Sequence, residues 1–198
     1  MLNAVSPSTH VVSEDELNQY AAMGTIIHGM AQMALEGDVN PAHLYTDYSK
    51  EWDCVQNGSL QLKPSDANTQ GFIEAHPEIH WHDARRMIEV EMFDDDMMLS
   101  GTADLFTLYY DKFATLDWKT SRSYSTEKKE KYFKQMALYS IMKEKQFNVK
   151  DKYLIIMPLN PHNKCGYGKA IVTDEVEKYK TLALEDLKTY NNLITQTR

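Results

Sequence analysis

Three side chains near the middle of this sequence have the types and spacing of a divalent-metal site. Asp104 precedes a run of β-forming residues, and Asp117 and Lys119 follow that run. Because side chains alternate across an extended strand, Asp117 and Lys119 share one face of it. Carboxylate oxygens are the ligands that hard divalent cations prefer. Two carboxylates and a lysine at one end of a sheet therefore predict a metal site with a positive charge beside it.

The segment between these residues is a predicted β-hairpin. Leu105–Tyr110 is rich in β-forming residues, Asp111 and Lys112 have the polarity of a tight turn, and Phe113–Leu116 resumes an extended run. This pattern puts Asp104 at the start of the first strand. A register that matches the turn would bring Asp104 beside the aspartate that follows the second run.

The order of four short motifs resembles that of a known family. Gly101–Asp104 followed by Asp117–Thr120 is similar to the core of the PD-(D/E)XK nuclease superfamily. Gly24–His28 and Gln135–Tyr139 resemble the helix motifs of its RecB-like exonuclease branch, of phage and bacterial type. CRISPR-associated relatives hold an iron–sulfur cluster on four cysteines. This chain has only two cysteines, which excludes that variant. The resemblance implies one nuclease domain over residues 1–198, an α/β fold with a restriction-endonuclease-like core and a central mixed sheet flanked by helices.

The resemblance also implies a ligand set. Asp104 and Asp117 would bind the metal together with His28 and the backbone carbonyl of Trp118. Glu89 lies where the family often has a glutamate on its first core strand, so it is a candidate secondary ligand or a residue that orients one. An exposed strand face is the equal alternative for Glu89. Oxygen ligands favour Mg²⁺ or Mn²⁺, and a histidine among them shifts the preference toward Mn²⁺.

His28 lies on a predicted helix that begins with a capping box at Ser13 and Glu16 and ends at Gly37. It stands next to a stripe of apolar residues at helical spacing, so a core or boundary histidine is the alternative. The motif match favours a metal ligand. Gly24 in the same helix lowers helix stability, which predicts a close approach of other backbone at that position.

Lys119, Gln135 and Tyr139 complete the predicted catalytic residues, with Asp104 and Asp117. In the family mechanism the lysine orients the attacking water or stabilises charge in the transition state. Gln135 and Tyr139 are four residues apart and hence on one helix face. The resemblance implies that they position the lysine or the DNA, and a purely structural interface pair is the alternative.

The leading hypothesis is a metal-dependent DNA exonuclease. It would hydrolyse phosphodiester bonds of single-stranded DNA or duplex ends in recombination, repair or phage DNA processing, with a protein partner in a recombination complex. A structure-specific endonuclease on the same fold is the second hypothesis. The third is a non-catalytic nucleic-acid-binding or scaffold protein, against which the intact Asp104, Asp117 and Lys119 count.

The overall charge does not by itself suggest a nucleic-acid partner. The formal net charge is −8, which repels phosphates. One segment is different, because the chain from Lys119 to Lys134 contains six basic residues and only two glutamates. A solvated helix face and a phosphate-binding role are equally supported readings of that segment. The predicted DNA contacts are Arg122, Lys128, Lys129, Lys131 and Lys134.

Other features set the expected environment. No apolar run approaches the roughly 20 residues that a membrane helix needs, so no membrane partner is expected. The first residues lack the pattern of a signal peptide, and a cytoplasmic location is the expectation. Cys54 and Cys165 are isolated in sequence and are predicted to be free thiols.

Three further elements are predicted. One short helix covers Pro41–Asp53, and a strand covers Met87–Phe93 with Glu89 and Glu91 on the same face. A helix covers Glu127–Gln146. The histidines at 76, 80 and 82 are predicted to cap the fold or to line one wall of the active-site cleft, and a metal site there is the less favoured alternative.

Overall fold

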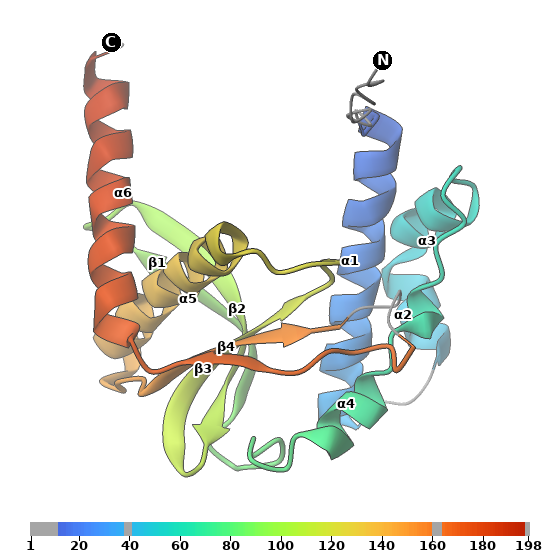
Figure 1. Cartoon of the computed structure of the whole chain (residues 1–198), viewed down its shortest axis with the longest axis horizontal. Coiled ribbons are helices and arrows are strands. Elements are labelled where there is room, and N and C mark those ends of the chain that lie inside the picture. The colour runs from blue at the N-terminus through green and yellow to red at the C-terminus, as the bar shows by residue number, and fades with distance from the viewer. Residues whose placement is uncertain (1–11, 38–40, 160–163, 197–198) are drawn as a thin grey trace, which may run out of the picture.

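A computed structural model describes residues 12–37, 41–159 and 164–196 of the chain (Figure 1). Helix α1 (Glu14–Glu36) has the predicted start, because Ser13 N–H donates to Glu16 Oε2 at 2.7 Å and Glu16 N–H donates to Ser13 Oγ at 3.2 Å. It ends at Gly37, whose φ of 80° is left-handed and suits glycine. Both predicted helix boundaries are confirmed.

A five-stranded mixed sheet forms the centre of the molecule. Its strands lie in chain order and are β1 (Met87–Asp94), β2 (Leu99–Tyr109), β3 (Lys112–Lys119), β4 (Tyr153–Pro158) and β5 (Ile171–Thr173). Neighbouring strands are antiparallel except β3 and β4, which are parallel and joined by helix α5 (Thr126–Phe147). The predicted α/β class with a mixed sheet and flanking helices is confirmed.

The β2–β3 hairpin has a two-residue turn. Tyr109 pairs with Lys112, and Tyr110 and Asp111 both have positive φ, 43° and 62°. Such turns match the right-handed twist of the two strands. The turn fixes the register of the whole hairpin, since each pair further from it follows by alternation.

The region after α1 differs from its prediction. Instead of one helix over Pro41–Asp53, α2 (Pro41–Asp47) and α3 (Ser49–Gln56) are separated at Tyr48. The break directs the Tyr48 ring onto α1 at Gly29, where an added Cβ would lie 2.4 Å from a ring carbon. The polar stretch that follows contains a 3₁₀ turn η1 (Pro64–Asp66) and leads into helix α4 (Thr69–Ala75).

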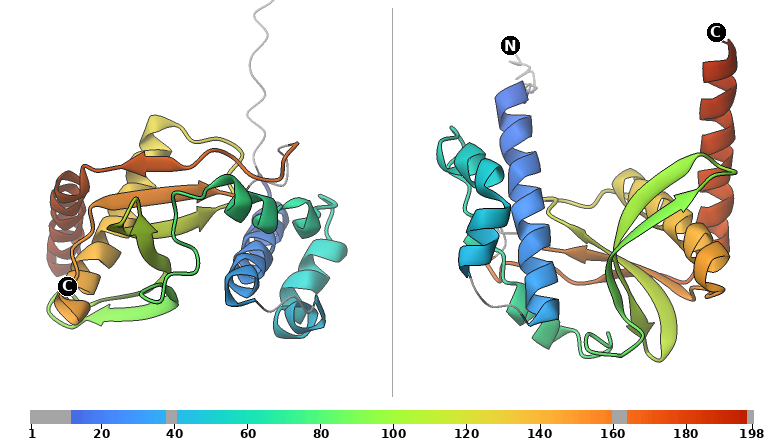
Figure 2. Two further views of the ribbon diagram at one scale, coloured as in Figure 1. Left: turned by 90° about the horizontal axis from the view of Figure 1, so that it is seen from below. Right: turned by 180° about the vertical axis from the view of Figure 1, so that it is seen from behind.

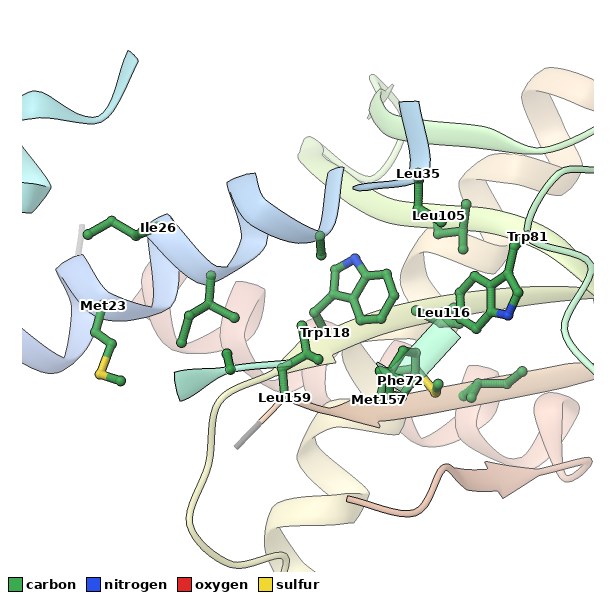
Figure 3. Packing of buried hydrophobic residues seen from close by; sticks show 14 of the residues in the cluster. Met23, Ile26, Leu35, Phe72, Trp81, Leu105, Leu116, Trp118, Met157 and Leu159 are labelled. Atoms are coloured by element: carbon green, nitrogen blue, oxygen red, sulfur yellow. The ribbon is translucent and has the colours of Figure 1, made fainter. Parts of the chain in front are cut away.

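Three clusters of buried side chains cover the two faces of the sheet. The largest lies against α1 and contains an aromatic group in which Trp81 and Trp118 are stacked at 5.9 Å, with Phe72 edge-on to Trp118 at 5.3 Å (Figure 3). The other two lie on the α5 side: one lies under α5 and α6 (Val176–Gln196), and the other contains Val90 and Met142. Helices α1–α3 thus lie on one side of the sheet, and α5 and α6 lie on the other (Figure 2). None of the described helices is long and apolar enough to cross a membrane.

Candidate active site

Asp104 lies in the middle of β2 and not at its start, because the strand begins already at Leu99. The register still brings Asp104 opposite Asp117, one step beyond the last hydrogen-bonded pair, Leu105 with Leu116. The two strands separate at this point. The Asp104 carboxylate fills the gap, and its Oδ2 accepts the Trp118 backbone N–H at 2.6 Å.

On its other side Asp104 lies opposite Glu89, and β1 is distorted there. Glu89 has a φ of 49°, which is costly for a residue other than glycine and is typical of functional sites. The strand changes faces at this residue, since Ile88 packs in the core of α1 while Val90 packs in a cluster under α5. The predicted simple alternation of β1 is therefore interrupted at Glu89. The distortion directs the Glu89 carboxylate toward Asp104.

His28 joins these two carboxylates from α1. Its Nδ1 lies 3.5 Å from Asp104 Oδ2, and one ligand atom from each of His28, Glu89 and Asp104 can be chosen so that all lie within 4.8 Å of one another. Among the residues that the structure describes, this is the only group of three or more such side chains. The geometry brings together a donor set that is suited to a metal ion, with one imidazole nitrogen and two carboxylates.

An open pocket of about 350 Å³ connects this cluster to solvent. Its lining includes His28, Glu89 and Tyr48. The predicted close approach at Gly24 is not what the structure shows, because a Cβ there would be in ordinary contact, 3.5 Å from Thr120 Oγ1. The close approach on α1 is at Gly29, next to the histidine.

Asp117 and Lys119 lie on the same face of β3, as predicted, and form an ion pair that is largely removed from solvent. The Lys119 ammonium also donates to Gln135 Oε1 at 3.4 Å, and Gln135 Nε2 donates to the Tyr139 hydroxyl at 2.9 Å. Helix α5 therefore reaches the lysine through the two residues of the predicted helix motif. The Trp118 ring is buried in the core, and a metal-binding role for its carbonyl stays a prediction.

A glycine allows this helix to come close. A Cβ on Gly101 would lie 2.8 Å from a ring carbon of Tyr139, closer than side chains pack. Gly101 thus lets the tyrosine lie against β2. The Gly101–Asp104 motif accordingly combines a contact surface for α5 with a buried carboxylate.

The site concentrates negative charge. Burial and the charge of Asp104 raise the pKa of Glu89 to about 7, and the same two causes raise the pKa of Asp117. Burial opposes the charged form of His28, but its hydrogen bond to Asp104 and the carboxylates around it outweigh burial and raise its pKa. Burial likewise opposes the charge of Lys119, and the Asp117 carboxylate overcomes this and raises the lysine pKa. Each shift favours binding of positive charge, as a proton or as a metal ion.

The basic residues on α5 and before it do not behave alike. Lys134 forms ion pairs with Glu130 and Asp186, both at 3.0 Å, so acidic side chains of the protein already compensate its charge. No comparable ion pair is found in the described part of the chain for the other four predicted DNA contacts, namely Arg122, Lys128, Lys129 and Lys131. These four are the members of the predicted set that are available to phosphates.

The histidine-rich region lies away from this site. Ile79 bridges to Tyr109, and His80 lies 3.7 Å from Asp111 in the hairpin turn. This is the end of β3 opposite to Lys119. The region therefore caps the hairpin, and the prediction that it lines a wall of the active-site cleft is wrong. Its chain follows the hairpin because His80 N–H donates to the Leu108 carbonyl at 2.9 Å.

Sequence reasoning missed Tyr132. Its ring centroid lies 4.9 Å from the Lys119 ammonium. The signal was present, since Tyr132, Gln135 and Tyr139 have the spacing i, i+3, i+7 of one helix face. The five-residue motif Gln135–Tyr139 includes only the last two.

A mixed sheet with two carboxylates and a lysine at the point where its central strands separate defines a nuclease-like α/β protein. The sequence model of the PD-(D/E)XK nuclease superfamily matches residues 4–196, and the chain belongs to this superfamily. Nucleases of the superfamily use divalent metal ions. Among curated proteins, the search found no match.

A solved structure supports the fold independently. The crystal structure of the "Putative exonuclease" from Eubacterium rectale superposes with a TM-score of 0.52 at 12% sequence identity. The match covers 88% of this chain and 66% of the other, so this chain spans somewhat less than two thirds of that protein. At this identity the likeness concerns the fold.

Proposed function

We propose that this protein is a metal-dependent deoxyribonuclease that removes nucleotides from DNA ends, in recombination, repair or phage DNA processing. The observation that carries the proposal is the convergence of His28, Glu89 and Asp104 with the Asp117–Lys119 pair. These residues come from α1, β1, β2 and β3, and no structural need brings so many charged groups together. Glu89 and the buried Asp117 both have a raised pKa, so the arrangement opposes the stability of the isolated protein.

The residues present fit a divalent cation. His28, Glu89, Asp104 and Asp117 would hold it, with Mg²⁺ or Mn²⁺ as the ions whose ligand preferences match carboxylate oxygens and one imidazole. A bound ion of this kind lowers the pKa of coordinated water and neutralises charge on a phosphate. The Trp118 backbone N–H holds one oxygen of Asp104 in place, so the carboxylate is oriented before any ligand arrives.

Lys119 would stabilise the negative charge that develops during hydrolysis. Hydrolysis of a phosphodiester builds negative charge on the phosphate oxygens and on the leaving oxygen, and the lysine ammonium lies beside the carboxylates where that charge would develop. It is held by Gln135 and by the Asp117 carboxylate, so its position is set by the fold. A charge that is positioned in advance stabilises the transition state without reorganisation.

End-labelled linear DNA and covalently closed circular DNA, each incubated with Mn²⁺, Mg²⁺ or EDTA, test the proposal. We expect metal-dependent release of mononucleotides or short products from the linear DNA and none from the circle. The matched control is Asp117→Asn, which keeps the volume of the side chain and removes its charge. Cleavage of the circle would establish the endonuclease alternative, and no cleavage with any metal would favour the scaffold alternative.

A further inference from the structure

The face of α5 that meets the end of β3 carries three side chains, and the site as assigned so far uses only two. Gln135 and Tyr139 are joined by a hydrogen bond at 2.9 Å, and Gln135 accepts from Lys119. Tyr132 lies one turn earlier on the same face, half-buried. Its ring centroid lies 4.9 Å from the Lys119 ammonium.

The ring is held in a fixed orientation by the segment that follows β3. The Tyr132 hydroxyl and Ser121 Oγ share a hydrogen bond of 3.0 Å. Tyr124 lies edge-on to the same ring at 6.3 Å, and its own hydroxyl donates to the Lys119 carbonyl at 2.8 Å. The backbone and the ammonium of Lys119 are thus both fixed by tyrosines of this short segment and the first turns of α5.

Asp117, Gln135 and Tyr132 surround the Lys119 ammonium. The carboxylate and the ring differ in whether they can also bind a metal ion. The Asp117 carboxylate is negative and, in the proposed function, also a metal ligand, so its oxygens are shared. A tyrosine ring attracts a cation through its π-electron face but does not bind Mg²⁺ or Mn²⁺ as a ligand. The ring can therefore hold the lysine while the carboxylate serves the metal, and it leaves the ammonium hydrogens free for a phosphate.

We infer that Tyr132 is a positioning residue for Lys119, and that its ring holds the ammonium at the reacting phosphate while Asp117 binds metal. This inference rests on the proposed nuclease function and adds a residue outside the four motifs to it. A lysine side chain has several rotatable bonds and is costly to immobilise. Tyr132 and Gln135 together restrict it from the α5 side.

The test compares Tyr132→Leu with Tyr132→Phe under single-turnover conditions at saturating metal. Phenylalanine keeps the ring and loses only the hydroxyl, whereas leucine removes the π face. We expect Tyr132→Leu to cleave about tenfold more slowly, the size of one partly desolvated cation–π contact, with unchanged DNA binding. Tyr132→Phe should recover most of the rate. Equal losses in the two variants, or a parallel loss of DNA binding and cleavage, would overturn the inference.

A double variant separates a positioning role from a general structural one. In the Lys119→Ala background, Tyr132→Leu should slow cleavage no further, because the group that it positions is gone. An additional tenfold loss there would show that the ring acts independently of the lysine and would overturn the inference. Tyr179→Leu is the control for lost aromatic packing, since this ring packs on Phe133 at 5.0 Å in the α5–α6 core, away from the lysine.

A measurement without turnover makes the result independent of the proposed function. Protons of the Lys119 side chain near the ring should show an upfield ring-current shift in nuclear magnetic resonance spectra of the wild type and of Tyr132→Phe. The shift should disappear in Tyr132→Leu and persist in Tyr179→Leu. An inactive wild type would count against the nuclease proposal, whereas an active wild type without the ring-current shift would count only against the role of Tyr132.

Discussion

Two lysine–aspartate pairs, one within β3 and one between α5 and the segment before β4, differ in how completely their polar atoms are satisfied. The site pair is Lys119 with Asp117, and the structural pair is Lys143 with Asp151. In the structural pair Lys143 Nζ lies 2.6 Å from Asp151 Oδ1, and Thr115 donates to the other carboxylate oxygen at 2.6 Å. Both of its side chains are almost fully buried.

The site pair is less complete. In the described part of the chain, Lys119 is the only ion-pair partner of the Asp117 carboxylate, and Asp104 lies next to it with a like charge. Burial, together with the neighbouring Asp104 charge, raises the pKa of Asp117. A fully satisfied buried pair is a device for holding elements in one arrangement, whereas an incompletely satisfied one has capacity left for a ligand. The contrast teaches that the number of polar partners, more than burial, distinguishes the site from the structural pair.

The largest effect is expected at the site pair itself. Asp117→Asn should lower DNA cleavage at least about a thousandfold, since it removes a ligand charge that the transition state needs. The melting temperature should change little, because the neutral amide also relieves repulsion from Asp104. Cleavage assays in Mn²⁺ and thermal unfolding of the same samples measure both quantities. Wild-type turnover in this variant would refute the assignment of Asp117.

The structural pair should show the opposite behaviour. Lys143→Met leaves the Asp151 carboxylate buried without its ion-pair partner, which should lower the free energy of unfolding by about 3–5 kcal/mol. Specific activity of the molecules that remain folded should be close to that of the wild type. The double variant Lys143→Met, Asp151→Leu should recover much of the stability, because it removes both charges. Denaturant unfolding gives the values, and unchanged stability of Lys143→Met would contradict the distinction.

Lys119 should affect rate more than binding. Lys119→Ala is expected to cleave about a hundredfold more slowly, as for loss of one electrostatic donor, while metal and DNA still bind. Lys119→Arg should not restore the full rate, because a planar guanidinium cannot replace a compact ammonium. Single-turnover cleavage and DNA binding, measured side by side, decide this. Equal loss of both would make the lysine a phosphate anchor.

The raised pKa values in the site should make the stability of the metal-free protein depend on pH. Glu89 has a pKa raised to about 7, so in the absence of metal its contribution to stability falls as pH rises from about 4.5 through 7. The raised pKa values of His28 and Asp117 act in the same direction. The protein should therefore unfold at a lower temperature at pH 8 than at pH 5.5, and Glu89→Gln should reduce the difference. Calorimetry in chelator tests this, and stability that rises with pH over this range would contradict it.

The smallest effect is expected from three lysines in the first turns of α5 for which the described part of the chain offers no ion pair. Replacing Lys128, Lys129 and Lys131 with Gln should flatten the dependence of log affinity for duplex DNA on log salt by up to ~0.9 per lost phosphate contact. Lys134→Gln is the matched control, because that lysine is already paired with Glu130 and Asp186. An equal change in slope for the control would mean that the paired lysine also reaches DNA.

Local patterns of the sequence determined much of this protein. The capping box at Ser13, the hairpin over Leu105–Leu116 and the shared face of Asp117 and Lys119 all follow from short-range rules, and each occurs as predicted. The four motifs in their family order also determined the superfamily. These features depend on neighbours a few residues apart, so one sequence is sufficient to read them.

Only the tertiary structure decided the rest. The left-handed conformation of Glu89 arises where β1 passes from the core against α1 to the cluster under α5. No local sequence pattern predicts it. The ring of Tyr132 meets Lys119 only because the parallel β3–β4 crossover lays α5 across the end of β3. The ion pairs of Lys143 with Asp151 and of Lys134 with Asp186 likewise depend on long-range packing. Side-chain periodicity specifies on which face of a helix or strand a residue lies. Which residue it contacts there depends on how elements distant in sequence pack together.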